Sequence, residues 1–518
     1  MARRYDERIF YGGARRDVPG FYPDPSICAV GRDFYLVNST FAYFPGVPIF
    51  HSRDLAHWRQ IGNVLTRPSQ LPLDGCRHSR GIYAPTLRYH DGTFYLITTN
   101  ISGGGNFIVT AQDPAGPWSE PYWLGDVAQG IDPSLLFDDD GRCYYVGNRP
   151  NPAGEQYGGD WEIWAQELDL TTMRLTGESH ALWKGALRDV IWPEGPHLYK
   201  KDGMYYLMIA EGGTGPNHSV SVARSKHVFG PYAGNPNNPI LTHRHLGSQY
   251  PVTCVGHGDL AADAEGNWYM VMLGMRPCGG HTLMGRETFL ARVEWQNGWP
   301  VVNPGVGKLE ETFPVPLPEE RTAETPLVYT FPTPELPPEF LTLRGPVPWQ
   351  ADGRLLLPLL PAALHDLHTP AYAALRVCGV DWQAETQLDF TPRTQFETAG
   401  LAYVQSSFSH LRAEKVLTDD GFALRLTTRE NDKDKILAEQ SIPDGPLILR
   451  LIAHRLHMAV YYVVGGSTAC LADAIDLRPY STESAGGFTG CTVGMYASAN
   501  GAISDSKASF SWFAMRNL

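Results

Sequence analysis

One phrase of sequence recurs five times in the first 300 residues of this chain. An acidic or proline-bearing step leads into a short apolar segment, and an aromatic-led segment begins about a dozen residues later. The five copies read YPDPSI with DFYLVN, YAPTLR with TFYLIT, IDPSLL with CYYVGN, PEGPHLY with MYYLMI, and GHGDLA with NWYMVM. Because one such unit cannot bury its own apolar face, a repeat with a period of about 50 to 60 residues predicts a propeller or a similar array.

The copies are alike in their aromatic positions and differ at one equivalent step. The aromatic positions are Tyr35, Tyr95, Tyr145, Tyr206 and Tyr269. At the equivalent step of the first segments stand Asp24, Ala84, Asp132, Glu194 and His257. A symmetric scaffold does not require such a varied set, so the variation indicates a functional site.

The length and composition predict an all-β protein of more than one domain. A chain of 518 residues is too long for a single core. The 25 Tyr, 21 Phe and 13 Trp favour strands, and the 53 Gly and 41 Pro favour the turns between them. Helical periodicity is weak throughout, which also favours an all-β fold.

Three regions follow from this pattern. Residues 1–305 carry the repeats and are the predicted propeller domain. Residues 306–349 are rich in proline, which neither a helix nor a central strand accepts, so we expect a surface connector. Residues 350–518 contain short alternating segments such as TQLDF, FALRLTT and LILRLIAH, separated by polar turns. These segments predict an antiparallel β-sandwich.

The charge and the cysteines limit the partners and the compartment. A net charge of −13 repels phosphate backbones and anionic lipid surfaces, so nucleic acid and membrane are not expected partners, and a neutral ligand fits better. The start MARRYDERIFYGG has no apolar stretch behind its basic residues, and no run is long enough to span a bilayer. Eight scattered cysteines without a CxxC pair favour neither a disulfide framework nor a zinc site. We therefore expect a cytoplasmic protein.

The acidic steps indicate a particular chemistry. In a propeller the first strand of each blade lies nearest the axis, so Asp24, Asp132 and Glu194 would converge from three blades. Carboxyl groups that lie close together split their pKa values, and cleavage of a glycosidic bond needs one protonated and one ionised carboxyl group. Each Asp-Pro step on its own is more typical of a turn than of a catalytic site. The shared register of all three acids favours the catalytic interpretation.

Six ordered motifs make the chain resemble glycoside hydrolase family 43. They are GFYPDPSI, STFAYFPGVPIFHSRDLAHW, GIDPSLLFDDDG, PEGPHLYK, GHGDL and LMGRETFL, and the tail resembles the β-sandwich of that family's β-xylosidase branches. The resemblance implies a five-bladed β-propeller followed by an antiparallel β-sandwich. It also implies an inverting hydrolase, in a family composed mostly of β-D-xylosidases, α-L-arabinofuranosidases and arabinanases.

The resemblance assigns a role to each polar residue of the motifs. It makes Asp24 the general base, Glu194 the general acid, and Asp132 the carboxylate that holds the acid and keeps its pKa raised. Arg286 would bind a sugar hydroxyl, although a structural ion pair with Glu287 or another acid is an equal alternative. In relatives, the residue that corresponds to His257 often reaches the axis and binds hydrated Ca²⁺. A histidine that is hydrogen-bonded in the core is the alternative, since calcium prefers oxygen ligands.

Four residues are candidates for the sugar pocket, because the apolar faces of sugar rings need aromatic walls. Phe41 and Tyr83 match positions that line the first subsite in relatives, with packing in the core as an equal alternative for each, and Thr214 is a weaker candidate. Phe488 matches a loop of the tail that reaches back into the active site. The β-xylosidases often have Trp in place of Tyr83, which gives some weight to an arabinofuranosidase.

These observations predict an inverting, exo-acting hydrolase that releases terminal β-D-xylose or α-L-arabinofuranose from short pentose oligosaccharides. The alternatives are an endo-arabinanase, which needs an open groove, and a catalytically silent carbohydrate-binding propeller. No organic cofactor is expected, and Ca²⁺ at His257 is the single cofactor candidate. The sequence ranks neither pentose over the other, and it leaves the oligomeric state open, a homo-oligomer included.

Overall fold

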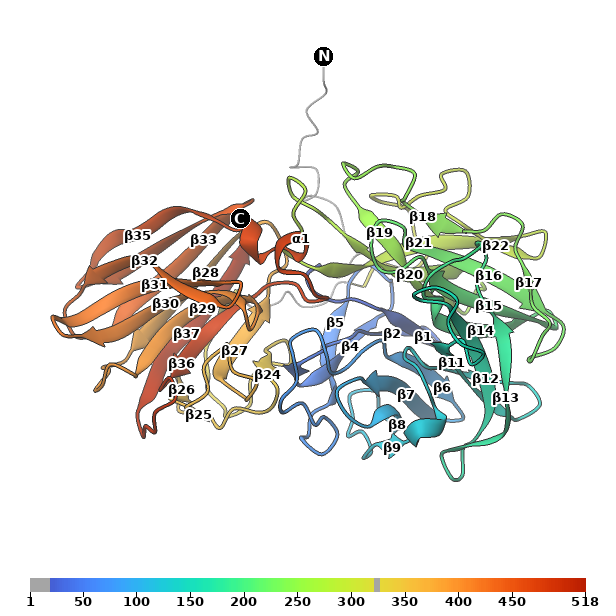
Figure 1. Cartoon of the computed structure of the whole chain (residues 1–518), viewed down its shortest axis with the longest axis horizontal. Helices are drawn as coiled ribbons and strands as arrows, with labels where there is room; N and C mark the ends of the chain where they lie inside the picture. Colours follow the sequence, from blue (N-terminus) through green and yellow to red (C-terminus); the bar gives the residue numbers. More distant parts are fainter. Residues whose placement is uncertain (1–18, 321–326) are drawn as a thin grey trace, which may run out of the picture.

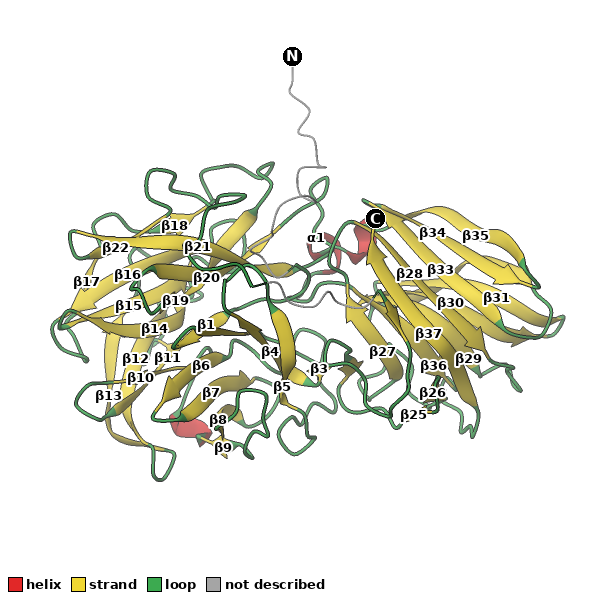
Figure 2. Ribbon diagram, turned by 180° about the vertical axis from the view of Figure 1, so that it is seen from behind, coloured by secondary structure: helices red, strands yellow, loops and turns green. Residues whose placement is uncertain are grey.

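The computed structural model describes residues 19–320 and 327–518, and these form two all-β parts that lie side by side. The first part is a ring of sheets around a central axis, drawn from blue to yellow-green in Figure 1. The second is a sandwich, drawn from orange to red in Figure 1 and seen from behind in Figure 2. The structure therefore has the expected all-β architecture, a five-bladed β-propeller followed by a β-sandwich.

Each blade is an antiparallel sheet whose strands come from one stretch of the chain, ordered from the axis outward. Blade 1 contains β1 (Ser26–Val30), β2 (Asp33–Val37), β4 (Gly46–Ser52) and β5 (Arg59–Leu65). Blade 2 contains β6 (Thr86–His90), β7 (Thr93–Asn100), β8 (Gly105–Ala111) and β9 (Tyr122–Trp123). Blade 3 contains β10 (Ser134–Phe137), β11 (Cys143–Pro150), β12 (Trp161–Asp169) and β13 (Arg174–Trp183).

The last two blades follow the same plan. Blade 4 contains β14 (Glu194–Lys201), β15 (Met204–Glu211), β16 (Ser219–Ser225), β17 (Ala233–Gly234) and the short β18 (Leu241–Thr242), which pairs with β16. Blade 5 contains β19 (Thr253–Ala262), β20 (Trp268–Met275), β21 (Arg286–Gln296) and β22 (Trp299–Val302). The two segments of each sequence repeat are thus the first two strands of one blade.

Hydrophobic clusters between neighbouring blades hold the ring together. Leu87 of blade 2 packs with Ile49 of blade 1, and Tyr145 of blade 3 packs with Ile97 of blade 2. Comparable clusters join blades 3 and 4, blades 4 and 5, and blades 5 and 1. The repeat predicts a unit that cannot bury its own face, and in the structure each blade buries its faces against its two neighbours.

The second part consists of two packed antiparallel sheets. One sheet contains β27 (Ala371–Arg376), β36 (Thr492–Ser498), β29 (Thr398–Ser406), β30 (Ser409–Thr418), β31 (Gly421–Glu430) and β32 (Lys433–Ser441). The other contains β25 (Gln350–Ala351), β26 (Leu355–Pro358), β37 (Lys507–Asn517), β28 (Asp381–Asp389), β33 (Leu447–His454), β34 (His457–Val464), β35 (Ser467–Asp476) and β23 (Val328–Tyr329). In β33 every second residue, from Leu447 to Ala453, is buried in the core of the sandwich.

The proline-rich connector joins the two parts. Its strand β24 (Thr342–Leu343) pairs with β3 (Tyr43–Phe44) of the propeller, whereas β23 pairs with β37 of the sandwich. A separate hydrophobic cluster, which includes Phe41, Leu343 and Tyr372, lies between the propeller and the sandwich. The domain boundaries drawn from sequence stay a prediction.

Helical structure is minor in the described residues. It comprises α1 (Thr482–Ala485) and the 3₁₀ turns η2 (Gly125–Val127) and η3 (Arg478–Tyr480). None of the described helices has the length and apolar character that a membrane span requires.

Candidate active site

The predicted site residues stand at the entrance of the innermost strands. Asp24 and Asp132 each lie two residues before the first strand of their blade, and Glu194 is the first residue of β14. Asp24, Asp132 and His257 adopt left-handed backbone conformations, with φ values of 52°, 53° and 51°. Residues other than glycine seldom adopt this conformation, and such strain is concentrated at functional sites. Three blades therefore share one unusual backbone geometry at the step where the sequence copies differ.

Asp24 is buried and forms an ion pair with Arg286. Arg286 Nη1 donates to Asp24 Oδ1 over 2.9 Å, and Ser39 Oγ donates to Asp24 Oδ2 over 2.6 Å. The same Nη1 donates to Thr214 Oγ1 over 3.2 Å. Of the two alternatives for Arg286, the structure shows an ion pair, and the partner is Asp24; Glu287 pairs instead with Arg276. Because this pair lies inside the site, it does not exclude contact with a sugar.

The surroundings of Glu194 and Asp132 raise the pKa of both groups, that of Asp132 to about 6. Burial raises the pKa of Glu194 well above its usual value, and the charges of Asp132 and Asp24 raise it further, against the opposing effect of Arg286. Burial also raises the pKa of Asp132, whereas His257 and the Gly195 N–H, which donates to Asp132 Oδ2 over 3.1 Å, lower it. The site therefore combines an acid that keeps its proton with a carboxylate in an ion pair.

Aromatic side chains form a wall beside Arg286. Ring centroids of Phe41 and Tyr83 lie 5.4 Å apart, and Phe488 lies 5.9 Å from Phe41 and 6.1 Å from Tyr83. The Arg286 guanidinium stands 5.0 Å from the Phe488 ring and 5.7 Å from the Phe41 ring. The structure thus brings together all five residues predicted to bind substrate: Phe41, Tyr83, Thr214, Arg286 and Phe488.

Phe488 lies on residues 481–491, a segment of the sandwich that is hydrogen-bonded to the propeller. Its N–H donates to Ser79 Oγ over 2.8 Å. The Glu483 carboxylate accepts from the N–H and the hydroxyl of Thr282, over 2.6 and 2.8 Å. The N–H of Cys491 donates to the Leu283 carbonyl over 2.9 Å. The sandwich therefore supplies one ring of the aromatic wall beside Arg286.

His257 lies buried beside the acids, with its ring against Gly195. A Cβ added to Gly195 would stand 2.9 Å from its Nδ1. Within residues 19–320 and 327–518, no three His, Cys, Asp or Glu side chains form a group that could hold a metal. One imidazole in the electric field of the Asp132 carboxylate suits a hydrated cation and does not suit a directly coordinated Ca²⁺.

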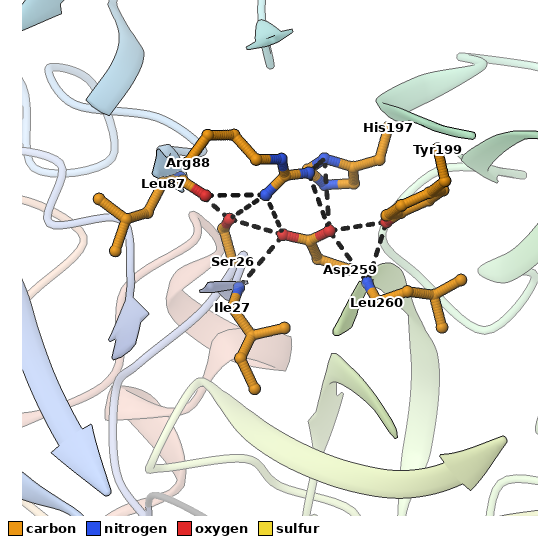
Figure 3. Close-up of polar contacts among 8 residues, drawn as sticks. All are labelled: Ser26, Ile27, Leu87, Arg88, His197, Tyr199, Asp259 and Leu260. Carbon is orange, nitrogen blue, oxygen red and sulfur yellow. Dashed lines mark hydrogen bonds and ion pairs between the residues drawn. The ribbon is translucent and has the colours of Figure 1, made fainter. Parts of the chain in front are cut away.

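Figure 3 shows a buried ionic network that the sequence did not reveal. At its centre is the Asp259 carboxylate, which is 0% exposed. Arg88 donates to it through two nitrogens, over 2.9 and 3.0 Å, and Ser26 Oγ and Tyr199 Oη each donate over 2.6 Å. Although burial alone raises the pKa of Asp259, the Arg88 guanidinium holds it well below its usual range.

This Asp259 network joins four blades. Ser26 belongs to β1, Arg88 to β6, Tyr199 to β14 and Asp259 to β19. Arg88 Nη2 also donates to Nδ1 of His197, whose pKa burial lowers to about 3, so the ring is neutral with its proton on Nε2. Ser26 follows Asp24 by two residues, and Asp259 follows His257 by two. This shared register, with Asp259 inside the GHGDL motif, is the sequence signal for the network.

The fold and the site together define a glycoside hydrolase. A propeller carries three convergent carboxyl groups with unequal protonation, an arginine and an aromatic wall, as acid- and base-assisted cleavage of a glycosidic bond requires. The chain belongs to glycosyl hydrolases family 43, whose sequence profile matches residues 17–300. Residues 328–516 match the β-xylosidase C-terminal concanavalin A-like domain.

Similar proteins extend over the whole chain. A xylosidase/arabinosidase of Butyrivibrio fibrisolvens is 53% identical over 97% of this chain and 98% of its own length. The non-reducing end α-L-arabinofuranosidase BoGH43B of Bacteroides ovatus is 38% identical over 97% of this chain and 94% of its own. Among solved structures, a xylan β-1,4-xylosidase of Bacillus halodurans C-125 has a TM-score of 0.90 at 34% identity, with 96% of this chain and 99% of that chain covered.

Proposed function

We propose that this enzyme is an inverting, exo-acting hydrolase that releases terminal β-D-xylose or α-L-arabinofuranose from short pentose oligosaccharides. The observation that carries the proposal is the contact of Phe488 with Phe41 and Tyr83, because the sandwich thereby closes one side of the pocket that holds the carboxyl groups. A closed side favours the end of a sugar chain over its middle. The names of the two curated relatives above support both pentoses as substrates.

The proposed reaction assigns one task to each carboxyl group. Asp24, held by Arg286 and Ser39, accepts a proton from the water that attacks the anomeric carbon. Glu194 keeps its proton until the glycosidic bond breaks, and then donates that proton to the leaving oxygen. Asp132 fixes the backbone beside the acid through the Gly195 N–H and raises the pKa of Glu194.

The test is to measure kcat/KM on p-nitrophenyl β-D-xyloside and p-nitrophenyl α-L-arabinofuranoside, with NMR of the first anomer released. We expect the inverted anomer, and only monosaccharide as product from a linear oligosaccharide. An initially retained anomer would overturn the inverting mechanism, and release of internal fragments would support an endo-acting enzyme. A wild-type chain that binds the sugars and cleaves none of them would support the carbohydrate-binding alternative.

We also propose that a hydrated Ca²⁺ binds beside His257, with water supplying most of its ligands. The ion would add positive charge near Asp132, and no step of the reaction above depends on it. Calorimetric titration of Ca²⁺ into EDTA-treated wild-type enzyme and into His257→Ala tests this proposal. Heat of binding from the wild type alone supports the site, and equal signals from both proteins would remove it.

A further inference from the structure

Trp192 is an exposed aromatic residue in a strained conformation, two residues before Glu194. Its side chain is 43% exposed, and its φ angle is 47°. A bulky residue in the left-handed region is a genuine outlier that persists only where the surrounding structure holds it. Burial in a core does not account for a strained indole that is this exposed.

Two neighbouring loops hold Trp192 in this conformation. Its N–H donates to the Gly159 carbonyl over 2.8 Å, and the carbonyl of Ile191 accepts from Gly212 over 3.0 Å. The indole lies against two glycines: a Cβ on Gly159 would stand 2.9 Å from its Nε1, and a Cβ on Gly213 would stand 2.8 Å from its Cε3. The ring is therefore seated between a loop of blade 3 and a loop of blade 4.

This position places the indole at the rim of the active site. Gly213 directly precedes Thr214, which accepts a hydrogen bond from Arg286, the partner of Asp24. The loops that hold the ring, residues 151–160, 184–193 and 212–218, all connect strands at the end of the propeller where Asp24, Asp132 and Glu194 stand. Trp192 thus lies beside the pocket and on the same segment as the acid.

We propose that Trp192 is a stacking platform for the leaving-group sugar, the ring whose glycosidic oxygen receives the proton of Glu194. The inference rests on the proposed function. A general acid stands on the leaving-group side of the scissile bond, so a residue on the same segment borders that side. A rigid, half-exposed indole offers a pentose ring an apolar face at little cost in conformational entropy. The aromatic wall around Phe488 would hold the terminal sugar, and Trp192 would select what that sugar is attached to.

Two variants test this role. Trp192→Gly removes the ring, and glycine accepts the left-handed backbone without strain, so the loop keeps its conformation. Trp192→Phe keeps an aromatic face of smaller area. The matched control is Trp123→Ala: Trp123 is 37% exposed and also covers a glycine, Gly104, but it lies on β9, the outermost strand of blade 2.

The measurement compares kcat/KM on a pentose disaccharide and on the methyl glycoside of the same pentose. Both leaving groups need the proton of Glu194, but only the disaccharide carries a leaving-group ring. We expect Trp192→Gly to lower kcat/KM on the disaccharide about tenfold and to leave the methyl glycoside unchanged. Trp192→Phe should retain most of the activity on the disaccharide, and Trp123→Ala should leave both values unchanged.

The possible outcomes separate this role from others. Equal losses on both substrates would overturn the proposal, because they would mean that Trp192 acts on Glu194 or on folding. Unchanged values on both substrates would overturn it as well. A wild-type enzyme that cleaves neither substrate would overturn the proposed function itself. If the wild type is active and Trp192→Gly keeps the wild-type ratio of kcat/KM on the two substrates, only the role of Trp192 is contradicted.

Discussion

At the scale of single residues, the two acids proposed for catalysis differ in their surroundings. Asp24 receives hydrogen bonds from Arg286 and Ser39, which stabilise a carboxylate. Glu194 is subject to burial and to the charges of two other carboxyl groups, which stabilise a carboxylic acid. Two residues of similar chemistry thus acquire opposite tasks from their neighbours.

The first prediction concerns these two tasks. Glu194→Gln should lose at least about a hundredfold in kcat/KM on an oligosaccharide, because its leaving oxygen needs a proton, and should lose far less on an aryl glycoside with a good leaving group. Asp24→Asn should lose activity on both, because activation of water does not depend on the leaving group. Steady-state kinetics on the two substrates checks this difference, and equal losses in Glu194→Gln would contradict the acid assignment.

The second prediction concerns pH. The negative charge of Asp132 raises the pKa of Glu194, so Asp132→Asn should lower that pKa. Activity requires protonated Glu194 and falls as pH rises through its pKa, so the basic limb of the kcat/KM profile should move to lower pH. The amide oxygen of the variant can still accept the Gly195 N–H, which keeps the backbone in place. A basic limb that stays in place would argue against the electrostatic role of Asp132.

At the scale of elements, segment 481–491 lets the sandwich take part in the active site of the propeller. It is held by backbone and side-chain hydrogen bonds to Thr282, Leu283 and Ser79. The approach is so close that a Cβ on Gly490 would stand 2.3 Å from the backbone oxygen of Met284. Glycine is needed here because two backbones touch.

The third prediction follows from this contact. Gly490→Ala should displace the segment and with it Phe488, which should lower kcat/KM about ten- to hundredfold. Gly103→Ala is the control, since its Cβ would meet nothing within 4 Å. Kinetics should be measured together with the thermal unfolding midpoint. Full activity in a folded Gly490→Ala variant would show that Phe488 does not depend on this approach.

The sequence predicts where strands lie better than it predicts the contacts between residues far apart in the chain. The aromatic-led segments became β2, β7, β11, β15 and β20, because alternation and residue preference are local properties. The acids were found through a shared register, which is also visible in one dimension. Asp259 shares that register, but its pairing with Arg88 has no sequence signal, since 171 residues separate the two and the pair exists only once the ring has closed. Trp192 was missed for a similar reason, because its backbone conformation depends on two glycines in other loops.

At the scale of the whole molecule, the Asp259 network ties blades 1, 2, 4 and 5 together near the axis. An ion pair in the interior is costly to break, because the remaining charge stays buried without a partner. This network therefore affects the stability of the ring more than any ion pair at the surface.

The fourth prediction is that Arg88→Met lowers the free energy of unfolding by about 3 to 5 kcal/mol, because it leaves the Asp259 carboxylate buried without its counter-ion. The control is Arg425→Met, which breaks a partly exposed pair with Glu439 on the sandwich and should cost no more than about 1 kcal/mol. Denaturant unfolding followed by tryptophan fluorescence and by circular dichroism compares the two. Similar costs in both variants would contradict a special role of the network.

Among the described residues no blade contains a strand from the part of the chain that forms another blade, so blades 1 and 5 meet without exchanging a strand. Their seam is closed by bonds such as Ser26 to Asp259, Tyr22 N–H to the Arg286 carbonyl over 3.1 Å, and Arg286 to Asp24. The proposed base and its arginine thus stand on opposite sides of the seam. A fluctuation that separates blades 1 and 5 therefore separates Asp24 from Arg286 while every strand stays intact. A sugar that binds on both sides of this seam should stabilise the closed ring.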